Sequence, residues 1–156
     1  MAATVVLVLA PRHPAPETPR LGATLVVAHG LALGAARHAP RWPRRAPAEV
    51  ERAVLAGGDM PSLVPGVLRV LLAALDDPAL AAATLEAEPT ASLPMAVRPL
   101  VVGPAAGELL AEGRRALRGV LTRVPSAIVP AAAWRAHDPD GATLRDVDTR
   151  RDLFHG

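Results

Sequence analysis

The sequence contains no cysteine, lysine, asparagine, glutamine or tyrosine, and only one phenylalanine. Without cysteine, disulfide bonds, zinc–thiolate sites and thiol nucleophiles are excluded. Without lysine, all 17 basic residues are arginine, and the net charge is only +2. The high isoelectric point therefore reflects the high pKa of the guanidinium group rather than a large excess of positive charge.

The arginines form one dense cluster, "RHAPRWPRR" at 37–45. No helical pattern combines a basic face with interleaved aromatic residues, so we expect no nucleic-acid partner. The first apolar run, "MAATVVLVLAP", lacks the positively charged start of a signal peptide. The run ends at Pro11, so it is too short to span a membrane. We interpret it as a buried strand and predict a cytoplasmic protein without a membrane partner.

The length of 156 residues and the hydrophobic content of 51% predict a single domain over residues 1–156. Strands alternating with helices favour an α/β domain with a mostly parallel sheet, in which ligands bind beyond the carboxyl ends of the strands. Residues 30–48 show no clean period and are expected to be irregular. The expected strands are 4–11, 23–29, 50–57, 81–88, 92–99 and 126–132, and the expected helices are 61–78, 105–113 and 114–124.

The stretch "GGDMP" at 57–61 follows one of these strands. A phosphate-binding loop leads its glycines straight into a helix, whereas here Asp59 intervenes and Pro61 delays the helix. Mg²⁺ binds one or two carboxylates together with substrate phosphates, so Asp59 is a candidate metal ligand. The alternative is a turn or helix-capping residue, and the pattern alone does not decide between the two.

A second acidic stretch, Asp146-Val147-Asp148, lies near the end of the sequence. Two carboxylates at positions i and i+2 point the same way in an extended segment. Thr149 can cap a helix that starts at Arg150. Taken alone, this stretch favours a capped terminal helix over a binding site.

Four segments together resemble the nucleotidyltransferase family that includes molybdenum cofactor guanylyltransferase. They are "AVLAGGDMPSLVPGVLRVLLAAL", "SLPMAVRPLV", "GRRALRGVL" and "TLRDVDTRRDL", and they cover residues 50–154 in the family's order. The resemblance implies a Rossmann-like three-layer fold. It also implies Mg²⁺ at Asp59 beside the triphosphate, with Gly58 next to the nucleotide. Asp148 would complete the metal site, and Asp146 and Asp148 would line the cleft for the pterin substrate. Arg98, at the end of the strand expected at 92–99, is a candidate anion contact in that cleft.

The reaction implied by the resemblance is transfer of GMP from GTP to Mo-molybdopterin. The implied partners are GTP, molybdopterin-type small molecules and molybdoenzyme maturation proteins. Two alternatives stay open: a sister nucleotidyltransferase, such as a cytidylyl enzyme, and a non-catalytic remnant or binding module.

The sequence departs from the family at its start. The family opens with a strand and a glycine-rich "LAGG" loop whose Arg and Lys hold the triphosphate, whereas "TVVLVLAP" here resembles the family's second strand. His29 stands where the family carries an aspartate. We therefore expect an N-terminally truncated domain with an unpaired sheet edge, through which copies of the chain could associate into a homo-oligomer.

Overall fold

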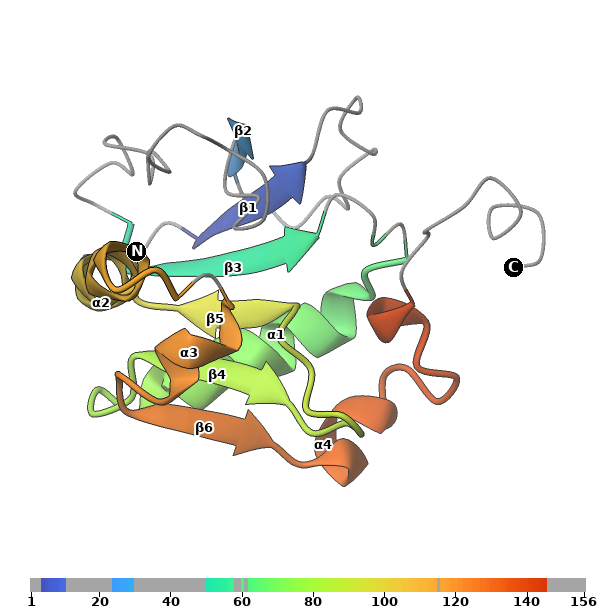
Figure 1. Ribbon diagram of the computed structural model, residues 1–156. Coiled ribbons are helices and arrows are strands. Elements are labelled where there is room, and N and C mark those ends of the chain that lie inside the picture. Colours follow the sequence, from blue (N-terminus) through green and yellow to red (C-terminus); the bar gives the residue numbers. More distant parts are fainter. Residues whose placement is uncertain are drawn as a thin grey trace.

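The computed structural model describes residues 4–10, 24–29, 50–57, 60, 62–114 and 116–145, with side chains from residue 50 onward. The strands are β1 (Thr4–Ala10), β2 (Thr24–His29), β3 (Arg52–Gly57), β4 (Ala82–Leu85), β5 (Met95–Val97) and β6 (Ser126–Val129). The α-helices are α1 (Pro65–Ala73), α2 (Pro99–Ala111), α3 (Arg118–Leu121) and α4 (Ala131–Arg135), and two 3₁₀ turns are η1 (Ala74–Asp76) and η2 (Ala142–Leu144) (Figure 1).

The described strands form one sheet in the order β2-β1-β3-β5-β4-β6. β5 runs antiparallel to its neighbours β3 and β4, and the other neighbouring pairs are parallel. Leu55 of β3 and Thr84 of β4 both pair with Met95 of β5, which lies between them, so β3 and β4 run in the same direction and end at the same edge. The predicted α/β fold with a mostly parallel sheet is therefore confirmed, and the carboxyl ends of β1, β2, β3, β4 and β6 define one edge.

The expected unpaired edge beside the first strand is wrong for the strands described. β1 pairs with β2 on one side and with β3 on the other, each over six residue pairs. β1 thus takes a central position next to β3, and it is paired on both sides. The edges of this sheet are β2 and β6. Association of copies through a sheet edge stays a prediction.

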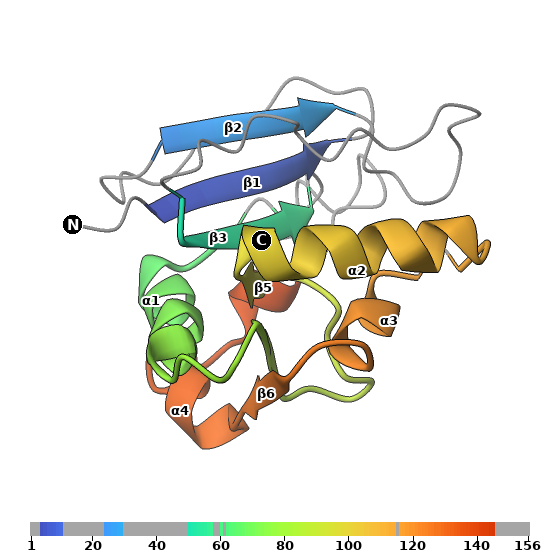
Figure 2. The same cartoon turned by 90° about the vertical axis from the view of Figure 1, so that its left-hand side faces the viewer.

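Helices cover both faces of the sheet and give the molecule three layers (Figure 2). One core cluster joins β3, β4 and β5 to α2 and α3; its larger buried side chains include Leu55, Met95, Val97, Val102, Leu109 and Val120. The cluster on the opposite face joins the same strands and β6 to α1 and α4; its larger side chains include Val54, Leu68, Leu71, Leu75, Leu85 and Trp134. Alternate residues of β3 therefore serve opposite cores, as the pleat requires.

The helix α1 forms because its apolar residues recur at helical spacing and face the sheet. Leu68 and Leu71 of α1 and Leu75 of the following η1 turn are fully buried, and burying each such side chain contributes about 1.5–3 kcal/mol. Pro65 occupies the first helical turn, where its missing N–H costs little. At the other end, η1 tightens the last turn and Asp77 is already extended. The helix expected over 61–78 therefore starts four residues later than expected, at Pro65, and ends close to its expected end.

Several element boundaries differ from the sequence-based prediction, and one helix was not predicted. The strand expected over 92–99 ends at Val97, because Pro99 starts α2. That helix continues through Pro104 to Ala111, so the helix expected at 105–113 is the second part of a longer one. The helix expected at 114–124 is reduced to α3, and α4 was not predicted because five residues after Pro130 show no helical period.

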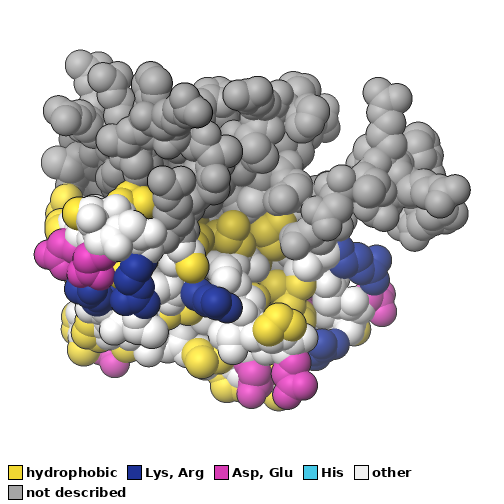
Figure 3. All heavy atoms as spheres, in the orientation of Figure 1, with side chains coloured by type: hydrophobic (Ala, Val, Ile, Leu, Met, Phe, Trp, Pro, Cys, Tyr) yellow, Lys and Arg dark blue, Asp and Glu magenta, His cyan; other side chains and the backbone are white. Residues whose placement is uncertain are grey.

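Charged side chains are interspersed on the face drawn in Figure 3, where arginines lie beside acidic residues rather than forming a single basic patch among the coloured residues. Arg123, which follows α3, forms ion pairs with Glu108 of α2 and with Glu112 just after that helix. None of the helices in the described ranges is long and apolar enough to cross a membrane.

Candidate nucleotide–metal site

The turn that follows β3 is closed by Met60. The Met60 N–H donates to the Gly57 carbonyl at 3.3 Å, and the Gly57 N–H donates to the Met60 thioether sulfur at 3.3 Å. Met60 is only 4% exposed, so its side chain anchors the turn in the protein interior. Gly58 and Asp59, the two predicted site residues between these partners, lie outside the described part of the chain. The turn leaves β3 at its carboxyl end, where an α/β sheet binds ligands.

The chain then enters α1 through Val64, which is extended and serves as the helix N-cap. The Val64 carbonyl accepts hydrogen bonds from the N–H groups of Val67 and Leu68. The Val64 N–H donates to the hydroxyl oxygen of Thr143 at 3.1 Å, across 79 positions of sequence. A side chain from the far end of the sequence therefore satisfies a donor at the start of this helix.

Thr143 belongs to a turn organised by Asp138. The Asp138 carboxylate accepts hydrogen bonds from the N–H groups of Ala142 at 2.9 Å and Thr143 at 2.8 Å. Gly141 makes this turn possible because its φ of 66° lies in the left-handed region, which favours glycine. The carboxylate and the threonine are both buried, with 4% of Asp138 and 1% of Thr143 exposed.

Opposing effects act on the pKa of Asp138. Burial raises the pKa, but the Thr143 N–H and hydroxyl, the Ala142 N–H and the positive charge of Arg145 together lower it by more. The pKa therefore lies below its ordinary value, and the carboxylate is ionised at neutral pH. The turn thus depends on a buried negative charge that is stabilised by hydrogen-bond donors.

These contacts bring together the flanks of the two acidic stretches. Met60 and Val64 lie just after Asp59 in the sequence, and Thr143 and Arg145 lie just before Asp146. The Val64–Thr143 hydrogen bond joins the two flanks directly. Asp146 and Asp148 themselves lie outside the described residues, as Asp59 does.

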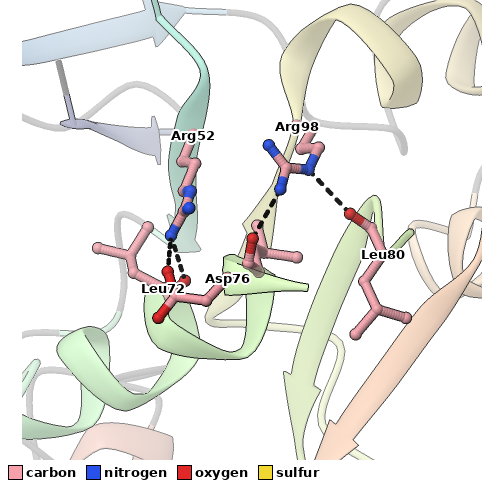
Figure 4. Close-up of polar contacts among 6 residues, drawn as sticks. Arg52, Leu72, Asp76, Leu80 and Arg98 are labelled. Carbon is pink, nitrogen blue, oxygen red and sulfur yellow. Dashed lines mark hydrogen bonds and ion pairs between the residues drawn. The ribbon is translucent and has the colours of Figure 1, made fainter. Parts of the chain in front are cut away.

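Arg98 is the one predicted site residue whose side chain is described, and it lies at the opposite edge of the sheet. It follows β5, which is antiparallel to β3, so it lies near Arg52 at the amino end of β3 (Figure 4). Its guanidinium donates to the carbonyl oxygens of Leu75 at 2.6 Å and Leu80 at 2.9 Å. These bonds stabilise the chain between α1 and β4. The position favours a structural role for Arg98 over the predicted contact with substrate in a cleft shared with Asp146 and Asp148.

The sequence predicts a metal site formed by carboxylates. Among the side chains described from residue 50 onward, no group of three His, Cys, Asp or Glu residues could hold a metal ion. The predicted ligands Asp59 and Asp148 supply hard carboxylate oxygens, the donor type that Mg²⁺ prefers. In donor chemistry, these two residue types therefore suit Mg²⁺.

Asp138 and Thr143 were missed by the sequence-based search. The signal for a turn is present in "DPDG" at 138–141, since Asp, Pro and Gly are turn residues. That signal does not reveal which aspartate is buried. It also contains nothing about Val64, the distant partner.

No protein-family model and no curated protein matches this sequence. Among solved structures, the fold is similar to molybdopterin-guanine dinucleotide biosynthesis protein A from Archaeoglobus fulgidus, with a TM-score of 0.59 and 20% identity over 66% of this chain and 52% of that one. It is similar to 2-C-methyl-D-erythritol 4-phosphate cytidylyltransferase from Thermus thermophilus, with a TM-score of 0.51 and 16% identity over 94% and 78% of the two chains. A putative protein from Aquifex aeolicus gives a TM-score of 0.56 and 13% identity over 96% and 95%.

The sheet and its solved neighbours define the class: this chain has a nucleotidyltransferase-type α/β fold. Within that class, the fold is similar to the guanylyltransferase fold implied by the sequence motifs. The chain spans about half the length of the Archaeoglobus protein, at 52% of it.

Proposed function

We propose that this protein is a Mg²⁺-dependent nucleotidyltransferase that transfers GMP from GTP to Mo-molybdopterin. The observation that carries the proposal is the contact between the flanks of the two acidic motifs, made by Val64 and Thr143 within a nucleotidyltransferase-type fold. The "GDMP" and "DVDT" stretches supply the carboxylates that such a reaction uses.

The proposed roles follow from the charge of the substrates. Asp59 and Asp148 hold the metal, and Gly58, which has no side chain, lets the nucleotide approach the backbone. Asp146 lines the pterin side of the cleft. When bound, Mg²⁺ supplies positive charge that neutralises the transferring phosphoryl group. A phosphate oxygen of the pterin substrate attacks the α-phosphorus of GTP, the bond to the β-phosphate breaks, and pyrophosphate leaves.

The chain itself contributes positioning rather than a covalent intermediate. The closed Gly57–Met60 turn and the buried Asp138–Thr143 turn hold the two carboxylate-bearing segments from opposite ends of the sequence. Arg98 is left out of this site because its guanidinium is engaged with two main-chain carbonyls at the other edge.

A cytidylyl reaction is the second candidate. The similarity to the cytidylyltransferase from Thermus thermophilus extends over 94% of this chain, and similarity to that fold favours neither base over the other. The third candidate, a remnant or binding module, is supported by the absence of lysine. Each lost charged contact to a triphosphate costs about 1.5–3 kcal/mol, so the loss of several would weaken nucleotide binding by orders of magnitude.

Calorimetric titration with GTP and with CTP, each with Mg²⁺, tests the three candidates together. We expect GTP to bind in the micromolar range and Asp59→Asn to abolish the binding. The control is Asp77→Asn, an exposed aspartate just beyond η1 whose carboxylate accepts a hydrogen bond from the Ala79 N–H; it should bind like the wild type. Preferential binding of CTP selects the cytidylyl reaction. If neither nucleotide binds, the transferase proposal is wrong.

A further inference from the structure

Three polar residues are buried among those with described side chains: Thr84, Asp138 and Thr143. Thr84 is satisfied locally, because its hydroxyl donates to the Ala91 carbonyl seven positions away. Asp138 and Thr143 instead form a connected unit that reaches Val64 at the start of α1. Burying polar groups costs free energy unless each finds a partner, and in this unit the partners are backbone N–H groups of two separate segments.

The chain is held firmly in both segments that meet at the Thr143–Val64 hydrogen bond. On one side, Val64 is followed at once by Pro65 and by the buried stripe of α1. On the other side, the turn is fixed to Asp138 by two hydrogen bonds, and Arg145 N–H donates to the Ala142 carbonyl. Gly66 packs against His137 so closely that a Cβ atom there would lie 2.9 Å from the imidazole. The start of α1 and residues 137–145 therefore form one packed assembly.

We propose that Asp138 and Thr143 are positioning residues for the nucleotide–metal site. They set the separation between the segment that carries Asp59 and the segment that carries Asp146 and Asp148. The inference rests on the proposed function, since it assigns these buried residues to the same site. Carboxylates from two segments bind one Mg²⁺ only if both lie about 2.0–2.1 Å from the ion, and catalytic constellations tolerate errors of about 0.5 Å.

The first experiment measures the separation directly. Because the chain has no cysteine, the double variant Ser62→Cys/Arg145→Cys places two spin labels on exposed residues, one on each segment. Thr143→Val removes the acceptor of the Val64 N–H while keeping the side-chain shape. We expect it to broaden or shift the distance distribution between the labels. Thr143→Ser keeps the hydroxyl and should restore the wild-type distribution.

The second experiment measures binding of Mn²⁺ alone by electron paramagnetic resonance of the free ion. We expect Thr143→Val to weaken Mn²⁺ binding by about tenfold, at the lower end of the effect of residues that orient metal ligands. Asp138→Asn, which keeps an acceptor oxygen, should weaken it in the same direction by less. The control is Thr84→Val, which removes a buried hydroxyl from β4; it should lower thermal stability but leave both the distances and Mn²⁺ affinity unchanged.

The outcomes separate the two proposals. If the wild type binds Mn²⁺, Asp59→Asn abolishes the binding and Thr143→Val binds as the wild type does, the positioning role is wrong and the proposed function stands. If the wild type does not bind Mn²⁺, both are overturned. If Thr84→Val weakens binding as much as Thr143→Val, the effect is general destabilisation and the positioning role is also overturned.

Discussion

The buried carboxylate of Asp138 makes a measurable contribution to stability. Its folded pKa lies below the ordinary value of about 3.9, because hydrogen bonds from Thr143 and Ala142 stabilise the charged form. The stabilisation is therefore complete above about pH 4 and is lost as the pH falls through the folded pKa. Asp138→Asn should reduce the free energy of unfolding at pH 7 by about 1–3 kcal/mol, since a buried N–H loses its acceptor.

Urea unfolding of the wild type and Asp138→Asn at pH 7 and pH 3 checks this. The difference between the two proteins should be smaller at pH 3, because this pH lies below the unfolded pKa of about 3.9 and the unfolded chain then takes up the proton more readily than the folded one. The control Asp140→Asn changes an exposed aspartate of the same loop and should follow the wild type at both pH values. A difference for Asp138→Asn that is equally large at pH 7 and pH 3 would contradict the electrostatic origin of the effect.

Arg98 should matter for stability rather than for nucleotide binding. Its guanidinium satisfies the carbonyls of Leu75 and Leu80, and Arg98→Gln cannot reach both. We expect a loss of about 1–3 kcal/mol in the free energy of unfolding, with the affinity for GTP and Mg²⁺ unchanged. Chemical denaturation and calorimetry on the same preparation check the two expectations. If Arg98→Gln is as stable as the wild type but binds GTP more weakly, Arg98 contacts the substrate as predicted from the sequence.

At the scale of single residues, the sequence indicates which residue types suit a metal–nucleotide site better than it indicates where each residue lies in the fold. Asp59, Asp146 and Asp148 were selected because carboxylates in these motifs suit a metal–nucleotide site. Arg98 was selected by its position after a strand, but β5 runs antiparallel, so that strand ends at the far edge. Local sequence contains no signal for strand direction, and none for the contact between Thr143 and Val64 across 79 positions.

At the scale of elements, the apolar runs predicted every described strand to within a few residues, because buried strands consist of short β-branched or aliphatic stretches. Helix boundaries were less predictable. The expected strand at 92–99 included Pro99 and the expected helix at 105–113 began after Pro104, yet Pro99 occupies the first turn of α2 and the helix continues through Pro104. The first position needs no N–H donor, and Pro104 is exposed on the helix surface.

Two glycines in helices offer a matched pair of substitutions. Gly66 of α1 faces His137, and an added Cβ would lie 2.9 Å from three side-chain atoms of that residue. Gly107 of α2 has nothing within 4 Å of the same added atom. We expect Gly66→Ala to destabilise the protein by about 1–3 kcal/mol through overpacking. Gly107→Ala should stabilise it by about 0.5–1 kcal/mol, because alanine has the higher helix propensity.

Thermal and urea unfolding of the two variants measure the difference. Opposite signs are expected, since both changes add one methyl group to a helix and only the surroundings differ. If both variants were stabilised, the contact between α1 and the segment after α4 would be looser than the structure has it. Spin labels at residues 62 and 145 would then report the same loosening.

At the scale of the whole molecule, the order of the strands follows from contacts that local sequence does not encode. β1 lies between β2 and β3, and β5 lies between β3 and β4 although it follows both in sequence. The sequence predicted the sheet's parallel character from the alternation of strands and helices. It did not predict the antiparallel strand, and it gave β1 an unpaired edge that the structure closes with β3. The order of the strands decides which strand ends lie next to each other at one edge of the sheet.

One sheet shared by two cores should make unfolding a single cooperative event. β3, β4 and β5 supply residues to both clusters, so a cavity on one face weakens the support of the other. Leu109→Ala on the α2 face should lower the free energy of unfolding by about 2–5 kcal/mol.

The fluorescence of Trp134 on the α4 face measures this in a Trp42→Phe background. The midpoint of the fluorescence change in urea should shift as far as the midpoint measured by circular dichroism. Leu71→Ala, on the same face as Trp134, is the control in which both probes must shift together. A fluorescence midpoint that stays at the wild-type value in Leu109→Ala would show that the two faces unfold separately.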